Sequence, residues 1–196
     1  MSCRSTPIRE AYNPPMSNPV LELPWVAETR RNHALEHATL HVLAAQYPHH
    51  NMAGHSNPTG FFILGDLPTD DIRSAVSEAL DRLRAGESQL AIHPGCGTNL
   101  ATSMLLAATF AWFVFRGARS GVGRILRAPF AVIFALVGLL ISRPLGPLLQ
   151  QKITTDAEMG NLEVLDVRLG LRGVVRAHRV VTRQTRTATD PSSVYA

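Results

Sequence analysis

Two segments of the first half of the chain are predicted to be helical, and in the second of them apolar side chains recur at helical spacing. The first segment runs from about Pro24 to Gln46 and ends before Tyr47-Pro48, because the residue that precedes a proline avoids helical backbone angles. The second opens at Thr69-Asp70-Asp71, where Thr69 supplies a cap and two acids favour a helix N-terminus, and it ends at Gly86. We therefore expect two helices here. The apolar stripe of the second consists of Ile72, Val76, Ala79, Leu80 and Leu83.

Two short apolar runs predict β-strands in the same region. The first covers residues 60–65, where an apolar run lies between two glycines, and the second covers residues 90–92. We expect residues 49–58 to form a loop. The order helix, strand, helix, strand predicts a small α/β domain over residues 26–97.

Two uncharged apolar runs follow, at residues 100–115 and 128–142. With their flanks, both approach the roughly 20 residues that a helix needs to span a bilayer. We therefore expect a transmembrane helical hairpin over residues 98–149, with a buried hairpin of a soluble core as the alternative. Arg143-Pro144 and Gly146-Pro147 are expected to end the second helix. The connection between the two runs carries Arg116, Arg119, Arg124 and Arg127. Beside it lie Trp112, Phe113 and Phe115, and aromatic residues next to arginines are typical of a membrane interface.

The last part of the chain alternates between apolar and polar residues, as a half-buried strand does. Residues 170–173 provide turn residues and residues 174–181 are β-rich, so we expect a β-hairpin over residues 155–184. Both ends of a helical hairpin emerge on the same side of a membrane, which allows this β-hairpin to pair with the edge of the N-terminal sheet. With disordered tails at residues 1–25 and 185–196, the chain is expected to be an α+β protein.

Charge and cysteine usage narrow the setting. The chain has 19 Lys and Arg against 15 Asp and Glu, and arginine dominates beyond residue 116. We expect the basic C-terminal part to attract anionic lipid headgroups, at about 1 kcal/mol per residue near the surface. No aromatic stacking pattern accompanies the arginines, so nucleic-acid binding is not expected. Two cysteines, Cys3 and Cys96, do not make a disulfide framework, which favours a reducing compartment.

Two features oppose each other in setting the membrane orientation. The arginines between the two apolar runs favour a cytoplasmic connection. The opposite topology keeps the N-terminal domain in the cytoplasm, and residues 1–24 contain no apolar core of a signal peptide. Because a long domain is rarely translocated without a signal, we expect a two-helix membrane protein with both termini in the cytoplasm.

The first predicted helix contains His33, Glu36 and His37 in an H-x-x-E-H pattern. At about 100° per residue, the two histidines lie about 40° apart, and Glu36 lies about 60° to the other side of His33. Two imidazoles and a carboxylate on one face suit a divalent metal with an activating base. His41, one turn further along, is a weaker ligand candidate because its angle to His33 is wider. Without a metal, this face is a set of hydrogen-bonded polar side chains, with Glu36 orienting a histidine.

A second candidate motif lies in residues 93–99, immediately before the first uncharged run. His93 and Cys96 are spaced as H-x-x-C. If both join the two helix histidines, the metal shell is filled and the site is structural; if His93 alone joins them, an open position remains for catalysis. Cys96 can also be interpreted as a nucleophile, because a helix N-terminus lowers the pKa of a thiol. The glycines beside it equally suit a simple chain reversal at the membrane surface.

The residues from His33 to His37 resemble the inverted zinc motif of the inverzincin metallopeptidases. The resemblance implies that His33 and His37 bind zinc and that Glu36 takes a proton from metal-bound water. That family also uses a downstream glutamate on another helix as a third ligand. Glu78, on the second predicted helix, is the candidate for that role, although the residues around it lack the family's pattern.

The chain as a whole resembles an uncharacterised family of bacterial membrane proteins. The resemblance rests on residues 31–39 (RNHALEHAT), on residues 93–99 (HPGCGTN) and on the two hydrophobic helices that follow, and it covers roughly residues 28–165. It implies the two-helix architecture and the pairing of the two motifs, but no particular reaction.

From these residues we expect a membrane-anchored, zinc-dependent hydrolase, and more specifically a metallopeptidase. His33 and His37 would hold the metal, with His93 or Glu78 completing the site. The alternative is a non-enzymatic membrane protein in which a structural metal joins these two helix histidines to His93 and Cys96. The small N-terminal domain leaves little room for an extended peptide cleft, which favours a small substrate, a protein partner or a homo-oligomer.

Overall fold

The computed structural model describes residues 18–172 and 175–185 of the chain. The predictions for Cys3 and for most of the two tails therefore fall outside the described residues, while residues 18–23 form turns before the first helix. The elements in chain order are α1 (Pro24–Gln46), β1 (Ala53–Asn57), β2 (Gly60–Leu64), α2 (Thr69–Arg84), the 3-10 helix η1 (Ser88–Ala91), α3 (Gly97–Phe115), α4 (Gly121–Leu149), the π-helical turn η2 (Gln150–Thr154), β3 (Leu162–Arg172) and β4 (Val175–Gln184).

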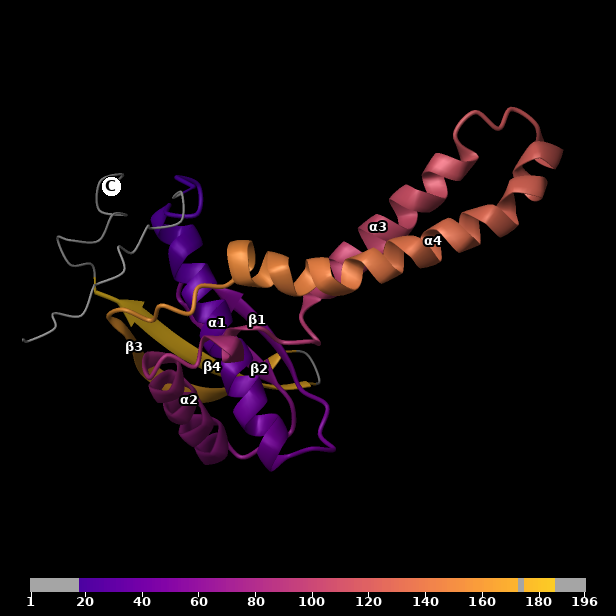
Figure 1. Cartoon of the computed structure of the whole chain (residues 1–196). Helices are drawn as coiled ribbons and strands as arrows, with labels where there is room; N and C mark the ends of the chain where they lie inside the picture. Colours follow the sequence, from indigo (N-terminus) through magenta and orange to yellow (C-terminus); the bar gives the residue numbers. More distant parts are fainter. Residues whose placement is uncertain (1–17, 173–174, 186–196) are drawn as a thin grey trace, which may run out of the picture.

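Four antiparallel strands form one sheet in the order β1-β2-β4-β3 (Figure 1). The C-terminal hairpin of β3 and β4 adds to the N-terminal hairpin through β4, which sets Phe61 opposite Val180 and Ile63 opposite His178. The predicted pairing between the two ends of the chain and the α+β class are thus confirmed. β1 and β3 are the edge strands.

Helices α1 and α2 pack on one face of this sheet (Figure 1). Where α1 meets the sheet, its residue Asn32 is fully buried and donates to the carbonyl oxygens of Asn57 (2.9 Å) and Pro58 (3.0 Å). Its Oδ1 accepts from the hydroxyl of Thr182 (2.7 Å). Because a buried amide is stable only when bonded, Asn32 fixes α1 to both the β1–β2 turn and β4. The fully buried apolar side chains of the core include Leu35, Leu43, Phe61, Ile63, Ile72 and Val180.

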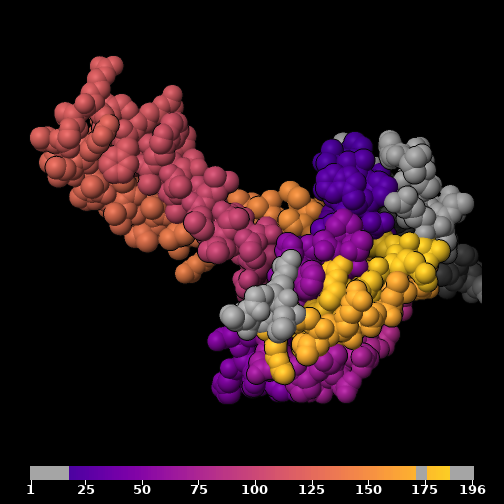
Figure 2. All heavy atoms as spheres, turned by 180° about the vertical axis from the view of Figure 1, so that it is seen from behind, coloured from indigo at the N-terminus to yellow at the C-terminus, as the bar shows by residue number. Residues whose placement is uncertain are grey.

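Helices α3 and α4 form a hairpin that projects from the globular part (Figures 1 and 2). Both α3 and the helical stretch from Gly121 to Thr154 are long and apolar enough to cross a membrane by length and composition. Inside the hairpin, Ser103 and Ser142 share a hydrogen bond of 2.8 Å, and a Cβ on Gly138 would lie 2.8 Å from the Leu106 carbonyl oxygen. Small residues thus allow close approach of the two backbones, as in membrane helix pairs. The exposed apolar side chains include Leu100, Met104, Leu105, Val122, Ile125 and Leu126.

Three local predictions are wrong. Residues 53–57, expected within a loop, form β1, because pairing with β2 supplies hydrogen bonds that its polar composition does not signal. Residues 90–92, expected to form a strand, belong largely to η1, where Leu90 and Ala91 pack into the core. Thr69 does not cap α2, and its hydroxyl lies 3.1 Å from Nε2 of His178 instead.

Helix α4 also runs further than predicted. Pro144 and Pro147 lie inside it, and η2 continues the helical path to Thr154. The prolines lack an N–H donor, but this part of α4 packs along α3, where Ser142 bonds Ser103 and Gly146 lies against Asn99, and the helix continues through both prolines. As a result, the end of α4 returns to α1, where Arg30 donates to the carbonyl oxygen of Ile153 (2.8 Å).

Candidate metal centre

The three side chains that were predicted to share a face of α1 do line one cavity. The ring centroids of His33 and His37 lie 4.3 Å apart, and Glu36 precedes His37 on the same wall. Their neighbours Leu35 and Ala38 are fully buried in the core. This packing fixes the rotation of α1 and directs the polar face toward the cavity.

A backbone carbonyl group orients each of the two histidines. His33 donates through Nδ1 to the carbonyl oxygen of Thr154 (3.0 Å), and His37 donates through Nδ1 to that of Ala91 (2.7 Å). Because a carbonyl oxygen only accepts, each ring carries a proton on Nδ1, and Nε2 of the neutral ring remains free for a second partner. Proteins commonly orient histidine ligands of metals in this way.

Cys96 completes a group of three candidate ligands. It is the N-cap of α3, where Sγ accepts from the backbone N–H of Thr98 (3.4 Å) and lies 3.5 Å from Nε2 of His33. The ligand atoms of His33, His37 and Cys96 all lie within 4.8 Å of one another. A tetrahedral ion with bonds of about 2.0–2.3 Å needs ligand atoms roughly 3.5 Å apart, so shifts on the order of 1 Å close the group. This His-His-Cys group could hold a metal ion.

The same contacts shift the ionisation of the group. Burial alone would raise the pKa of Cys96, but hydrogen bonds with His33, His37 and Thr98 lower it to about 5. Burial lowers the pKa of His33, yet the hydrogen bond to Cys96 and the charge of Glu36 outweigh this and raise it. Cys96 is therefore a thiolate at neutral pH, which is the form that binds metals.

Glu36 is buried between α1 and the edge strand β1. The hydroxyl of Ser56 donates a hydrogen bond of 2.5 Å to its Oε2. Gly54 lies against the same carboxyl group, and a Cβ at this position would overlap it. Burial raises the pKa of Glu36, although the hydrogen bond from Ser56 opposes this. Neither Ser56 nor Gly54 carries a signal in the sequence, because their short segment lacks the apolar alternation of a strand.

A cavity of about 420 Å³ contains these groups. One wall is α1, and a second is the loop that carries His93 and Cys96. The third wall is formed by five consecutive residues. Alternate residues of a strand point to opposite faces of its sheet, so consecutive residues line one cavity where it runs along the edge of the strand. The residues of this third wall are Met52, Ala53, Gly54, His55 and Ser56.

His93 lies beside the group of three but outside it. Its ring centroid is 5.6 Å from that of His37 and 5.0 Å from that of His41. Burial and these two neighbours lower the pKa of His93 to about 4, so its ring is neutral. His41 lies 2.8 Å through Nε2 from the carbonyl oxygen of Ile92. The structure thus brings three predicted ligands together and sets a fourth next to them.

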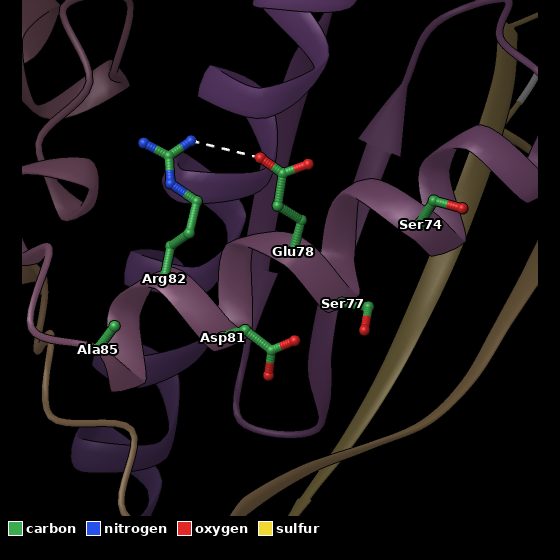
Figure 3. A pocket seen from close by; sticks show the side chains of 6 residues that line it. All are labelled: Ser74, Ser77, Glu78, Asp81, Arg82 and Ala85. Atoms are coloured by element: carbon green, nitrogen blue, oxygen red, sulfur yellow. Dashed lines mark hydrogen bonds and ion pairs between the residues drawn. The ribbon is translucent and has the colours of Figure 1, made fainter.

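Glu78 lies on the outward face of α2, as Figure 3 shows. Its carboxylate pairs with Arg82 at 3.5 Å, and both residues line a surface depression with Ser77 and Asp81. Because the apolar stripe of α2 faces the core, Glu78 is directed away from it. It does not line the cavity that contains the histidines, so the structure does not bring this predicted third ligand to the site.

Gln150 is a residue of the site that sequence reasoning did not identify. It is fully buried, and its Nε2 donates to the carbonyl oxygen of His93 (3.2 Å) and to Oδ1 of Asn99 (2.7 Å). Its Oε1 accepts from the backbone N–H of His93 (2.9 Å). Gln150 therefore ties the loop that carries Cys96 to the end of α4. In the sequence it is only a polar residue after an apolar run.

The fold and site define an α+β protein with a candidate metal group at the base of a long apolar helical hairpin. The chain belongs to the family described as "Domain of unknown function (DUF6391)", which matches residues 28–167. It is also 40% identical over 141 residues to an uncharacterised protein of Picosynechococcus sp. strain PCC 7002. That alignment covers 64% of this chain, and the chain spans 65% of the length of this relative. No solved structure matches the chain.

The family assignment confirms the resemblance to an uncharacterised family that the two motifs indicate. The matched range runs from α1 into β3, so it contains His33, His37 and Cys96 as well as both helices of the hairpin. The family's description names no activity.

Proposed function

We propose that the protein is a membrane-anchored, zinc-dependent hydrolase that acts on peptides. The observation that carries this proposal is a single cavity in which His33, His37 and Cys96 lie together with Glu36, a buried carboxyl group of raised pKa. A set of metal ligands with an adjacent proton acceptor is the combination that metal-assisted hydrolysis requires.

The ligand chemistry favours zinc. Two imidazoles and one thiolate suit a borderline-soft ion, and three protein ligands leave the fourth tetrahedral position open, as in catalytic zinc sites. Bound here, zinc would polarise a substrate carbonyl group and make a water molecule more acidic. The carbonyl groups of Thr154 and Ala91 keep the two histidine rings oriented for such an ion.

Glu36 is the residue that moves the proton in this proposal. Its raised pKa brings a carboxyl group closer to neutrality, where it both accepts a proton from water and returns it to a leaving amine. Ser56 and the close approach of Gly54 hold the carboxyl group in place from the side of β1.

The edge of β1 supports a peptide as the substrate. The cavity runs along this edge, where an antiparallel strand directs backbone N–H and C=O groups away from its sheet. An extended peptide binds such an edge by adding a strand of its own. Strand addition needs no deep cleft, which accommodates a peptide substrate in a small domain.

Membrane anchoring is proposed from the position of the hairpin. Cys96, which lines the cavity, immediately precedes α3. The start of α3 is the base of the hairpin (Figure 1). With the hairpin inserted, the cavity would face the membrane surface and act on chain segments that lie next to it. We propose that the globular part and both termini are cytoplasmic.

A structural metal site is the second candidate function, and the position of His93 favours it. Its ring lies beside that of His37, so a local movement of the loop could supply a fourth ligand. A filled shell has no position for a substrate. The metal would then fasten α1 to the base of the hairpin.

Bound metal and hydrolysis, measured on the same full-length preparations in mild detergent, test the proposal. Glu36→Gln is expected to retain zinc by elemental analysis and to lose hydrolysis of a fluorogenic peptide library by about 100-fold or more. The control Glu78→Gln, on the outward face of α2, should retain both. Wild-type protein without bound metal, or Glu36→Gln with unchanged hydrolysis, contradicts the enzyme. A wild-type protein that binds zinc but hydrolyses no peptide supports the structural site instead, provided that Cys96→Ser loses both the zinc and thermal stability.

A further inference from the structure

We propose that the tip of the hairpin binds the headgroup of an anionic phospholipid. The tip, defined as residues 112–128, is the part of the hairpin farthest from the globular part (Figure 1). A cavity of about 530 Å³ lies there, and its lining includes Trp112, Arg116, Arg124 and Ile125. The inference requires that the hairpin enters a membrane, and it is independent of the proposed hydrolase.

Two arginines bring uncompensated positive charge to this cavity. Arg116 and Arg124 are exposed, and neither forms an ion pair with any residue that the structure describes. The sequence contains no Asp or Glu from residue 88 to residue 155, so the hairpin has no acidic group of its own to neutralise them. Guanidinium groups bind phosphate oxygens through paired N–H donors.

The remainder of the cavity suits a lipid more than a free anion. The guanidinium group of Arg116 lies 5.5 Å from the centre of the Trp112 ring, a cation–π distance. Tryptophan is typical of the membrane interface, so this contact keeps the charge of Arg116 at headgroup depth. Ile125 adds an apolar surface for the start of an acyl chain. The N-terminus of α4, capped by Ser120, lies at the same end and contributes the positive end of the helix dipole.

The nearby Arg127 does a different task. Its Nη1 donates to the carbonyl oxygens of Val114 (3.3 Å) and Arg116 (3.1 Å), so it caps the end of α3 and is not assigned to the lipid site. Three arginines of the C-terminal hairpin region also have partners, and the tip offers more unpaired charge than they do. These three pairs are Arg168 with Asp166, Arg176 with Asp66 and Arg183 with Glu163.

Trp112 allows a direct test, because bromine atoms on an acyl chain quench the fluorescence of a nearby tryptophan. The sequence has two tryptophans, so Trp25→Phe in the full chain leaves Trp112 as the reporter. This protein is reconstituted in phosphatidylcholine vesicles that contain equal fractions of either brominated phosphatidylglycerol or brominated phosphatidylcholine. The ratio of the two quenching efficiencies measures the preference of the tip for the anionic lipid.

Each basic residue near an anionic surface contributes a factor of about five, so we expect at least about a fivefold preference for phosphatidylglycerol. Adding Arg116→Gln and Arg124→Gln together should lower the ratio by at least about fivefold, since Arg119 and Arg127 of the tip keep their charge, and Arg124→Gln alone should give an intermediate value. The matched control is Arg143→Gln, an exposed arginine of α4 distant from the tip cavity, which should leave the preference unchanged.

Equal quenching by the two lipids before the arginines are changed would overturn the proposal. So would a preference that the double substitution leaves unchanged, or one that Arg143→Gln lowers equally. Absence of quenching by both lipids would show that Trp112 is not in the bilayer and would also overturn it. If millimolar inorganic phosphate abolishes the preference, the ligand is a free phosphate and the lipid assignment is wrong. Circular dichroism shows whether each variant folds. If the double variant does not fold, the single variant Arg124→Gln decides the test.

Discussion

Cys96 is the residue whose ionisation the structure changes most clearly. A free cysteine titrates at about pH 8.5. At this site, hydrogen bonds with His33, His37 and Thr98 outweigh burial and lower the pKa to about 5. The thiolate therefore persists as the pH falls below neutrality and is lost only as the pH passes about 5.

This shift predicts how the thiol reacts in protein from which metal has been removed. In a Cys3→Ser background, alkylation of Cys96 by iodoacetamide should keep its rate from pH 8 down to about pH 5 and then decline. His33→Gln removes one hydrogen bond to the sulfur and should raise the pKa of Cys96. As the pH is lowered, alkylation of this variant should therefore begin to slow at a higher pH than in the wild-type protein. Added zinc should protect the thiol, because a thiolate bound to the proposed zinc ion does not react with the reagent. A midpoint near the ordinary value in the wild-type protein would contradict the described site.

Gly54 tests the support of Glu36 from β1. A methyl group at this position would overlap the Glu36 carboxyl group, so Gly54→Ala should displace Glu36 and destabilise the fold by about 1–3 kcal/mol. We expect lower thermal stability in detergent and reduced hydrolysis with zinc retained. Gly121→Ala is the control, because a Cβ there meets nothing within 4 Å. Equal melting temperatures for Gly54→Ala and the wild-type protein would show that the overlap is absent.

The sequence predicts part of this site because helical spacing is a local property. His33, Glu36 and His37 could be assigned to one face from their offsets alone. The distance from His33 to Cys96, which are 63 positions apart, depends on how the hairpin base docks on α1 and has no local signal. Glu78 is the opposite case, a residue that the sequence suggested as a ligand but that the structure keeps away from the site. A glutamate on a nearby helix was chemically suitable, but it faces outward.

Among the elements, those whose own residues specify them were predicted well. α1 begins and ends where Pro24 and Tyr47-Pro48 indicate, and α2 has a clear apolar stripe. β1 was missed because a five-residue edge strand of small and polar residues exists only through its pairing with β2. The extension of α4 through Pro144 and Pro147 was missed because the missing N–H of proline is visible in the sequence, whereas the packing of this segment along α3 is not.

Gln150 links two of these elements, and its substitution tests that link. Gln150→Leu keeps a similar volume but leaves groups of His93 and Asn99 without their partner, each at a cost of about 1–3 kcal/mol. We expect a lower melting temperature and zinc binding weakened by about 10- to 100-fold, as for residues that orient metal ligands. The adjacent exposed Gln151→Leu should change neither. Unaltered zinc affinity in Gln150→Leu would show that the loop held by Gln150 does not position the metal ligands.

On the scale of the whole molecule, the two ends of the globular part meet in one sheet, and the hairpin leaves from its side (Figure 1). The turn from α4 back into β3 delivers the carbonyl group of Thr154 to His33, while the entry into α3 delivers Cys96. The candidate metal centre is thus assembled where the hairpin joins the globular part. A metal bound there would hold that junction together, whether or not it also catalyses a reaction.

We propose that His33, His37 and Cys96 bind one zinc ion and leave its fourth position open. X-ray absorption spectroscopy of the zinc-loaded full-length protein tests this most directly. We expect one sulfur at about 2.3 Å, two histidine nitrogens at about 2.0 Å and one further light atom from solvent. The sulfur should be lost in Cys96→Ser, and His93→Gln should leave the shell unchanged. A shell with three histidine nitrogens, one of which disappears in His93→Gln, or a shell without sulfur, would contradict it.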